Sequence, residues 1–486
     1  MQTRRNFIKT AGLALLCNSC ATPQKKRVLV NDVHTRLNPT WVDGIREVRT
    51  LNALHRTVQD SERLQKKISI AGGRHAGGGQ QFRADNWLVD TRKMNRVLGF
   101  DRDRGLIEVE SGIQWRSLVR FLIQKQSDLP AWTFAQKQTG TDQLTMGGAV
   151  ASNIHGRALT MKPFIGDIES FVLVDAHGTI RNCSRSENPE LFRLAVGGYG
   201  LFGMIYSVKI RLVPRTKVER VVTIFPVEEL IPAVTDRIKT GFTYGDFQFA
   251  VDSRSEDFLR KGVFSCYRPV ESTAQISKGR PLRLADWRNL VYEAHIRPTD
   301  AFEKYAAYYK STSGQIYWSD LSQFSRYLEG YHEAIDQRMS ASRPSTEVIT
   351  ELYVPHAALT DFMARARRLL RQNGSEVIYG TIRFIEPDKE SFLPWARDRF
   401  ACIIFNLHTE HSADGIAKSK KALRGLIDLA IAANGNFYLT YHRYATRKQI
   451  LSCYPQFPEF LKRKTIHDPQ ERFESDWYRH QVALLS

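Results

Sequence analysis

Residues 68–79 read ISIAGGRHAGGG, in which a short apolar strand runs directly into a loop. Five of the eight residues from Gly72 to Gly79 are glycine, and such a loop can turn its backbone N–H groups toward a phosphate. The loop is not a Rossmann fingerprint, because no ordered Gly-x-Gly-x-x-Gly opens a helix here. It is not a P-loop either, because no Gly-Lys-Ser/Thr closes it. Alone, it fits a phosphate cradle and a purely structural turn equally well.

Two further glycine-dotted segments follow the first. Residues 138–156 read QTGTDQLTMGGAVASNIHG, and residues 197–203 read GGYGLFG. Backbone donors from several such segments can surround one long anionic ligand. The three segments together therefore favour a bound cofactor over isolated structural turns.

Around these segments the hydrophobic pattern alternates between strands and helices. Residues 171–181 read as a hairpin, with an apolar strand, a turn that contains Gly178 and a second strand. The other predicted elements are helices over 46–67, 114–125 and 189–195, and strands over 68–71, 87–90, 105–112 and 204–213. We place a domain boundary near Pro214.

The second half contains a faint internal repeat of strand, proline and helix. It occurs at residues 221–240 and again at residues 351–372. The elements predicted after it are strands over 376–385, 400–408 and 436–444, and a helix over 416–433. This order predicts an antiparallel sheet with helices on one face. Residues 254–345 show no clear period, and we expect loops and helices there.

The composition is that of a globular protein. The chain has 486 residues, enough for two or three domains with real cores. Hydrophobic residues make up 42% and charged residues 25%, which excludes a disordered, collagen-like or multi-spanning membrane protein. Six cysteines are too few for a disulfide scaffold. We expect Cys183, Cys266, Cys402 and Cys453 to be unpaired buried thiols.

The first residues read as an export signal rather than as part of the fold. Residues 1–10, MQTRRNFIKT, contain Arg4 and Arg5, and the apolar run 11–16 follows. A charged start and a short apolar core are typical of a signal peptide, and the paired arginines indicate the twin-arginine route. The run is too short to span a bilayer as a helix, although a short buried or interfacial helix is an alternative. We predict a twin-arginine signal peptide over residues 1–21 and a periplasmic location.

Two processing routes remain open for this signal. Cleavage before Cys20 would leave a lipid-anchored protein at the membrane, although Asn18 fits a lipobox poorly. Cleavage after Ala21 would leave a soluble periplasmic protein. Twin-arginine substrates cross the membrane folded, often because a cofactor is inserted first, which again points to a bound cofactor.

The charge balance is strongly basic. Lys and Arg number 70 against 51 Asp and Glu, a net charge of +19. This charge fits a solvated cationic surface, contact with anionic lipid headgroups at a membrane surface, or an anionic substrate. The sequence contains no nucleic-acid-binding motif, so we expect no nucleic-acid partner.

In this order, the three glycine segments resemble the FAD-binding fold of the vanillyl-alcohol oxidase / p-cresol methylhydroxylase superfamily, termed PCMH-type. The matching stretches are residues 69–75, 146–148 with 153–156, and 196–203. The resemblance covers residues from about 45 to 215 and continues more faintly to the C-terminus. It implies an α+β fold with a two-part FAD-binding PCMH-type domain over 30–214, an α+β substrate-binding cap domain with an antiparallel sheet over 215–445, and a C-terminal segment over 446–486 that returns to the FAD domain.

The resemblance also implies which residues hold FAD. A histidine at the position of His75 often bonds covalently to the flavin in this superfamily, and the alternative is a histidine that only hydrogen-bonds near it. The backbone of residues 72–77 would hold the pyrophosphate, and His155 would lie near the flavin. The implied cofactor-binding residues are Ala71, Gly72, Gly73, Arg74, His75, Ala76, Gly77, Gln80, Gly140, Thr141, Met146, Gly147, Gly148, Ser152, Asn153, His155, Gly156, Gly203 and Ile205.

Within the superfamily, the chain looks most like the aldonolactone and alditol oxidases, with decaprenylphosphoryl-ribose oxidase second. Residues 380–394 resemble the alditol-oxidase segment whose arginine meets the substrate, and Arg383 falls on that arginine. The acidic residue before the Ile-Arg pair is Thr381 here, and only His442 matches the His-Trp-Gly-Lys run. The implied catalytic residues are Arg383 and His442, for alcohol binding and proton removal, with a structural role in the sheet as the alternative for each.

The resemblance implies an FAD-dependent oxidase or dehydrogenase. Such an enzyme oxidises a CH–OH group of a polyol, sugar lactone or sugar-like alcohol by hydride transfer to flavin N5, and passes electrons to oxygen or another acceptor. The alternatives are a lipid-linked (polyprenyl-phosphoryl) sugar oxidase or epimerase component, and a flavin-fold binding protein without catalysis. Residues 408–411, HTEH, match no zinc spacing, so no metal is expected.

Overall fold

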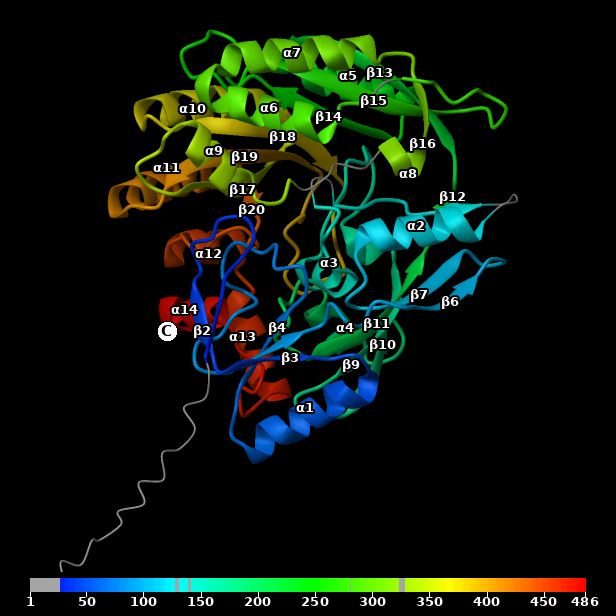
Figure 1. Cartoon of the computed structure of the whole chain (residues 1–486), viewed down its shortest axis with the longest axis vertical. Coiled ribbons are helices and arrows are strands. Elements are labelled where there is room, and N and C mark those ends of the chain that lie inside the picture. Colours follow the sequence, from blue (N-terminus) through cyan, green and yellow to red (C-terminus); the bar gives the residue numbers. More distant parts are fainter. Residues whose placement is uncertain (1–26, 127–130, 139–140, 280, 323–327) are drawn as a thin grey trace, which may run out of the picture.

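The computed structural model describes residues 27–126, 131–138, 141–279, 281–322 and 328–486. The predicted signal peptide over 1–21 and the predicted cofactor contact Gly140 lie outside the described residues, so export and lipidation stay predictions. Figure 1 shows a lower part, built from the residues before β13 together with the C-terminal helices, and an upper part built around one large sheet.

The lower part contains a small parallel sheet, ordered β3-β5-β4. Its elements are β3 Gly44–Glu47, α1 Leu51–Arg63, β4 Ile68–Ala71 and β5 Trp87–Asp90. The helix predicted from residue 46 is wrong at its start, because residues 44–47 pair with β5. The Thr50 hydroxyl then accepts a hydrogen bond from Ala53 N at 3.1 Å. This cap satisfies a free N–H group of the first turn, so α1 begins there.

A second sheet in the lower part has five antiparallel strands, ordered β10-β9-β11-β7-β6. Its strands are β6 Val97–Asp101, β7 Leu106–Glu110, β9 Ile168–Val174, β10 Ile180–Ser184 and β11 Met204–Arg211, and the helices of this region are α2 Trp115–Lys125, α3 Met146–Ser152 and α4 Pro189–Ala195. The predicted hairpin is confirmed as β9 and β10. Buried Trp115 and Phe171 belong to the core that these elements share.

Several short elements complete the lower part, up to the point where the chain passes into the upper part. They are β1 Val28–Val30, β2 Thr40–Val42, β8 Trp132–Thr133, the 3-10 helix η1 Phe164–Gly166 and β12 Val213–Pro214. Strand β12 pairs with β8 in the lower part, and the next strand, β13, already belongs to the large sheet. The chain therefore passes into the upper part between residues 214 and 217.

The large sheet of the described residues has eight strands, ordered β16-β13-β15-β14-β18-β19-β17-β20. All neighbouring pairs among them are antiparallel. The strands are β13 Lys217–Pro226, β14 Tyr244–Phe249, β15 Lys261–Val270, β16 Ile316–Trp318, β17 Ser345–Pro355, β18 Val377–Ile385, β19 Phe400–Glu410 and β20 Asn436–Phe437. The predicted α+β class with an antiparallel sheet is confirmed.

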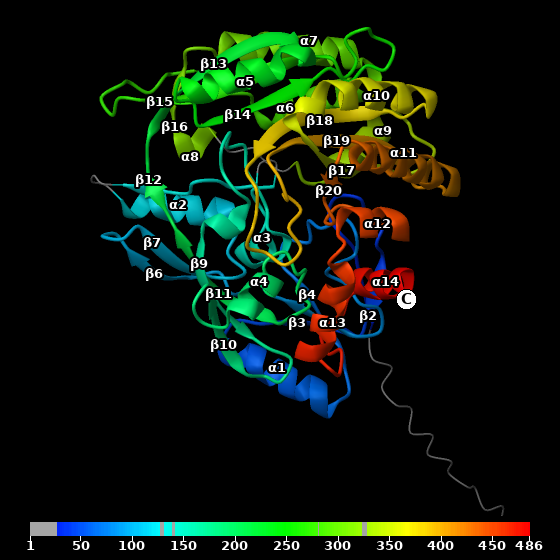
Figure 2. The ribbon, with the colours of Figure 1, turned by 180° about the vertical axis from the view of Figure 1, so that it is seen from behind.

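Helices cover both faces of the large sheet, so the predicted single covered face is wrong (Figures 1 and 2). One face carries η2 Val227–Glu229, α5 Leu230–Lys239, η3 His356–Ala358, α10 Leu359–Gln372 and α11 Ala413–Ala432, and the other carries α6 Leu284–Ile296, α7 Pro298–Ser311 and α9 Tyr331–Arg338, with α8 Ser319–Ser322 after β16. Strand β13 gives the reason. Its Val221 and Phe225 join the main core, while Val222 and Ile224 join a second cluster with side chains of α7.

The strand predicted over 436–444 is mostly wrong, because only Asn436–Phe437 pair with the sheet. The following carbonyls bind the glycine loop of the lower part instead. Gln80 Nε2 donates to Leu439 O at 2.7 Å, and Gly77 N donates to Thr440 O at 3.1 Å. Residues 438–441 therefore connect the two parts rather than extend the sheet.

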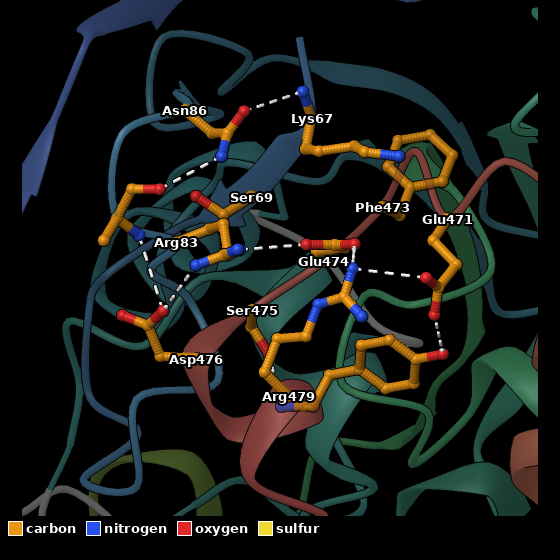
Figure 3. Close-up of polar contacts among 12 residues, drawn as sticks. Lys67, Ser69, Arg83, Asn86, Glu471, Phe473, Glu474, Ser475, Asp476 and Arg479 are labelled. Atoms are coloured by element: carbon orange, nitrogen blue, oxygen red, sulfur yellow. Dashed lines mark hydrogen bonds and ion pairs between the residues drawn. The ribbon is translucent and has the colours of Figure 1, made fainter. Parts of the chain in front are cut away.

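The C-terminal helices α12 Arg447–Cys453, α13 Phe457–His467 and α14 Asp476–Leu485 lie against the lower part (Figure 1). Phe473 forms a parallel bridge with Ile68 of β4. Figure 3 shows the fully buried Glu474 carboxylate between Arg83, whose Nε donates to it at 2.9 Å, and Arg479. A buried carboxylate needs such partners, so these contacts hold the end of the chain on the lower part.

The four scattered cysteines Cys183, Cys266, Cys402 and Cys453 are buried and unpaired, as predicted. None of the described helices combines the length and the apolar character needed to cross a bilayer.

Candidate functional site

A cavity opens where the loop after β4 meets α3 and the start of β11. It contains about 700 Å³ of empty space, a figure that includes its opening to solvent. Six of its lining residues are glycines, so backbone forms much of the wall. The lining residues are Ile70, Gly72, Gly73, Arg74, His75, Ala76, Gln80, Gln81, Thr91, Ser111, Leu144, Gly147, Gly148, Ala151, Ser152, Tyr199, Gly200, Gly203 and Ile205.

Gly72 shows why this wall needs glycine. A Cβ atom at Gly72 would lie 2.0 Å from Thr145 Oγ1, which is far too close. The same hydroxyl accepts a hydrogen bond from Gly148 N at 3.3 Å and caps α3. The loop after β4 and the start of α3 are therefore held in close contact with backbone exposed to the cavity. Such backbone suits the diphosphate of a dinucleotide.

His75 lines the cavity and contacts a second histidine that the sequence does not predict. Its Nδ1 lies 2.9 Å from Nε2 of His34, and the Gln143 carbonyl accepts a hydrogen bond from its ring. Burial, and then the neighbouring His34, hold the pKa of His75 well below its usual value. Burial lowers the pKa of His34 to about 4. Both imidazoles are therefore neutral at physiological pH.

Many of the predicted cofactor-binding residues line this cavity. They are Gly72, Gly73, Arg74, His75, Ala76, Gln80, Gly147, Gly148, Ser152, Gly203 and Ile205. The sequence prediction did not single out Ile70, Gln81, Thr91, Ser111, Leu144, Ala151, Tyr199 and Gly200 as contacts. Thr91 had a usable signal, because it directly follows the predicted strand over 87–90, whereas Ser111 lies inside the predicted strand over 105–112 and follows β7 only in the structure.

Other predicted cofactor contacts do not line the cavity, namely Ala71, Gly77, Thr141, Met146, Asn153, His155 and Gly156. The Asn153 amide donates to Asp388 Oδ2 at 2.9 Å, and its oxygen accepts from Ile165 N. His155 is fully buried, with Nε2 2.5 Å from Glu351 Oε1. Asn153 and His155 therefore fix the chain around the cavity through contacts with other protein groups.

A buried charged cluster lies where residues 134–138 of the lower part meet β14 and β18 of the large sheet. Arg157 Nη1 lies 3.5 Å from Asp246 Oδ1 on β14, and Lys137 and Arg383 are also buried. Among the described residues, Nε and Nη1 of Arg383 have no hydrogen-bond partner. A buried cation without partners is costly, so this guanidinium is prepared to bind oxygen atoms of a ligand.

Lys137 is the acid–base group of this cluster. Burial lowers the pKa of Lys137 to about 7, and the cations Arg157 and Arg383 also lower it, while Asp142 raises it. A neutral amine is therefore available near physiological pH and can accept a proton. The sequence analysis did not predict a role for this residue. In the sequence it is only a lysine within residues 134–138, FAQKQ, and the structure shows that all five residues are buried.

Tyr441 connects the charged cluster to the cavity. Its carbonyl oxygen lies 2.5 Å from the position of a Cβ atom at Gly77, so the glycine loop passes directly beside it. Burial, and then the carboxylate of Glu351 on β17, raise the pKa of Tyr441, whereas Arg383 lowers it. Tyr441 therefore lies between the cofactor loop and the side chains of the large sheet.

His442 is bonded through both ring nitrogens to Tyr444 and Thr350. His442 Nδ1 accepts from Tyr444 N at 3.3 Å, which requires that Nε2 carry the proton and donate to Thr350 Oγ1 at 3.1 Å. Burial lowers the pKa of His442 to about 4. With both ring nitrogens bonded inside the protein, His442 is poorly placed to take a substrate proton.

Glycine backbone that faces a cavity and suits a diphosphate is typical of proteins that bind a nucleotide cofactor. Comparison with known families specifies this class, because residues 42–184 match the family described as "FAD binding domain". The lower part therefore contains an FAD-binding domain, in agreement with the PCMH-type resemblance, and its cofactor is FAD.

Curated relatives include sugar-lactone oxidoreductases. L-gulonolactone oxidase of Bos taurus is 28% identical over 189 residues, which are 39% of this chain and 39% of that protein. Decaprenylphosphoryl-beta-D-ribose oxidase of Mycolicibacterium smegmatis is 29% identical over 129 residues, 26% of this chain and 27% of the relative. L-gulono-1,4-lactone dehydrogenase of Mycobacterium tuberculosis is 22% identical over 418 residues, 84% and 89% of the two chains. The match to the bovine oxidase thus spans well under half of that protein.

Proposed function

We propose that this protein is an FAD-dependent oxidoreductase that oxidises a CH–OH group of a sugar lactone, polyol or related alcohol. One observation carries the proposal, namely the buried Arg383, whose Nε and Nη1 have no partner among the described residues and which neighbours the low-pKa amine of Lys137. This pair can bind an alcohol oxygen and remove its proton. The names of the bovine and mycobacterial relatives support a lactone as the substrate class.

Each buried group has a separate role in the proposed oxidation of an alcohol. FAD, when bound, supplies the hydride acceptor. Arg383 binds the oxygen of the reacting carbon and stabilises negative charge on it. Lys137, with a pKa of about 7, accepts the hydroxyl proton. Tyr441, held beside Glu351, orients the remaining hydroxyl groups of the substrate.

Anaerobic reduction of the bound flavin tests this proposal. Mixing the oxidised protein with L-gulono-1,4-lactone, D-arabinono-1,4-lactone or xylitol is expected to remove the visible flavin band with at least one of them. A chemical reductant provides the control for a fully reducible flavin. A flavin that the chemical reductant bleaches, but that no lactone or alditol reduces, contradicts the proposal and favours a binding protein without catalysis.

The same experiment also tests the alternative in which the substrate is a lipid-linked sugar. The net charge of +19 also suits a phosphate-bearing substrate. A polyprenyl-phosphoryl pentose is therefore presented in detergent under the same anaerobic conditions. Reduction by this compound and by none of the soluble alcohols would replace the lactone with a lipid-linked sugar.

We further propose that a ring nitrogen of His75 bonds covalently to a ring methyl carbon of the flavin, with loss of the N–H and one C–H hydrogen and with the two electrons passing to the same oxygen or other acceptor that reoxidises the flavin. Its neutral ring lines the cavity, and attachment would replace its hydrogen bond to His34 or to the Gln143 carbonyl. Acid precipitation is expected to leave the yellow colour in the pellet, and His75→Ala to release it into the supernatant. His34→Ala is the matched control, since it keeps the His75 ring. Colour released from the unaltered protein would make His75 a non-covalent contact.

A further inference from the structure

Three histidines and one glutamate meet on the face of the large sheet that α6 and α9 cover (Figure 1). His295 lies in the last turn of α6, His332 in α9, and Glu347 and His408 are paired across β17 and β19. One possible ligand atom from each of His295, Glu347 and His408 lies within 4.8 Å of the other two. The proposed function uses none of these side chains.

The proton positions in this cluster are constrained by the backbone. His295 Nδ1 lies 2.8 Å from the Val291 carbonyl, which can only accept, so Nδ1 carries the hydrogen. In the neutral ring, His295 Nε2 then presents a lone pair. It lies 3.1 Å from Glu347 Oε1, another acceptor. Two acceptors at this distance need a cation between them, which is either a proton or a metal ion.

The other oxygen of Glu347 is already held by the protein. Oε2 accepts a hydrogen bond from the Tyr331 hydroxyl, and His332 Nδ1 lies 3.3 Å from it. The Glu347 side chain is only 3% exposed. Tyr331 and His332 therefore fix the carboxylate so that Oε1 faces His295, as partners behind a metal ligand commonly do.

His408 supplies the third group. Its ring meets the ring of His295 edge-on, with centroids 5.2 Å apart and planes at 87°. His408 Nδ1 is buried and has no hydrogen-bond partner among the described residues. A proton shared between His295 and Glu347 would leave this nitrogen unsatisfied, whereas a metal ion would bind it as well.

We propose that His295 Nε2, Glu347 Oε1 and His408 Nδ1 bind a divalent transition-metal ion of the zinc class. Two imidazoles and one carboxylate form a known zinc ligand set, with water in the fourth position. Ligand atoms about 2.0–2.1 Å from zinc in a tetrahedral site lie roughly 3.3 Å from one another. The 3.1 Å separation of His295 Nε2 and Glu347 Oε1 is close to this value, and a ligand atom of His408 lies within 4.8 Å of both side chains.

The ion would fasten α6 onto the large sheet. It would join the C-terminal turn of α6 to two neighbouring strands, at residues that are far apart in the sequence. The same region also contacts the lower part, because Thr346 Oγ1 donates to Thr35 O at 2.7 Å and Arg36 pairs with Glu333 of α9. We therefore expect metal binding to stabilise the large sheet together with its contact to residues 35–36.

Zinc uptake by the untagged, flavin-loaded protein tests this site. The protein is treated with a chelator, and the chelator is then removed. Titration with zinc against a chromophoric competitor is expected to show one tight site per chain, and zinc is expected to raise the melting temperature by several degrees. The unaltered protein alone can overturn the proposal, if it competes for no zinc and its melting temperature does not move.

Variants locate the site. His408→Gln and Glu347→Gln are expected to lose the tight site and the thermal shift, while Tyr331→Phe, which removes a partner of the ligand Glu347, is expected to weaken zinc binding about 10-fold. His356→Ala is the matched control, because His356 is a partly buried histidine with an unpartnered Nε2 in the described structure and lies outside the cluster. It is expected to bind zinc like the unaltered protein.

A second possible ligand group exists in the described structure and needs its own variant. His155, Glu351 and Cys402 also have ligand atoms within 4.8 Å of one another. Zinc binding that survives His408→Gln and Glu347→Gln but is lost in Glu351→Gln would place the metal there and overturn our assignment. The zinc titration does not depend on flavin reduction, so either result is independent of the proposed function.

Discussion

Substitution of Arg383 by methionine is expected to lower kcat/KM for the alcohol substrate by roughly 10²–10³-fold, the effect of removing one preorganised donor from a developing negative charge. Arg383 is buried on β18, and two of its nitrogens have no protein partner in the described structure. Methionine keeps an unbranched apolar stem of similar length, so the sheet should remain packed. The measurement is steady-state kinetics with the substrate that reduces the flavin, together with the flavin content of the variant.

A second readout separates catalysis from packing in this variant. The charge of Arg383 lowers the pKa of Lys137, so its removal is expected to shift the pH profile of kcat/KM toward higher pH. Arg399→Met is the control, because Arg399 is an exposed arginine that pairs with Glu386. If Arg383→Met retained kcat/KM within a few-fold and an unshifted pH profile, Arg383 would be a structural residue of the sheet.

The elements predicted correctly are those whose signals are local. The strand of residues 68–71, the hairpin of β9 and β10 and the helix of residues 189–195 each show their own period and turn residues. The helix start at Thr50 was missed because residues 44–47 become a strand only through parallel pairing with β5. Pairing between distant segments leaves no periodic pattern of apolar residues within the strand itself.

The large sheet was predicted only in part for a related reason. Its strands bury both faces, so their residues do not alternate cleanly between apolar and polar, and the sequence does not reveal the second layer of helices. Strand β17 shows this, since Glu347 and Glu351 are buried and point to the same face. Each lies within 3.1 Å of a histidine from elsewhere in the chain, His295 for Glu347 and His155 for Glu351. From the sequence alone, such a glutamate is predicted to be exposed, because the histidine that contacts it is not evident.

The sequence also predicts some residues of the candidate site and misses others. The glycine wall of the cavity follows from residue type, because only glycine permits the close approach seen at Gly72. Arg383 was reached through a resemblance to a motif. Lys137 was missed because its low pKa arises from burial and from Arg157 and Arg383, which come close only in the folded chain. His442 matches a motif by position, yet its ring is bonded to Tyr444 and Thr350.

Lys137→Met is expected to lower kcat/KM by roughly 10²–10⁴-fold, the usual effect of removing a general base. In the unaltered protein, kcat/KM is expected to rise with pH and to level off above about pH 7, because only the neutral amine can accept the proton. The variant should lose this pH step. Lys162→Met provides the control, because it makes the same substitution at an exposed lysine. A variant that kept both its rate and its pH step would exclude Lys137 as the base.

The stability of the Lys137→Met variant decides between a catalytic and a structural lysine. The pKa of Lys137 falls from 10.5 to about 7 on folding, so between these pH values the unfolded chain binds more protons and stability rises with pH. Below about pH 7 both states are protonated, and the buried charge destabilises the fold by a constant amount. Methionine removes that cost. The variant should therefore melt at a higher temperature than the unaltered protein at pH 6, and this gain should shrink as the pH approaches 10. A variant that loses activity and melts lower at pH 6 would show that Lys137 supports the fold, whereas lost activity with raised stability is the signature of a residue retained for chemistry.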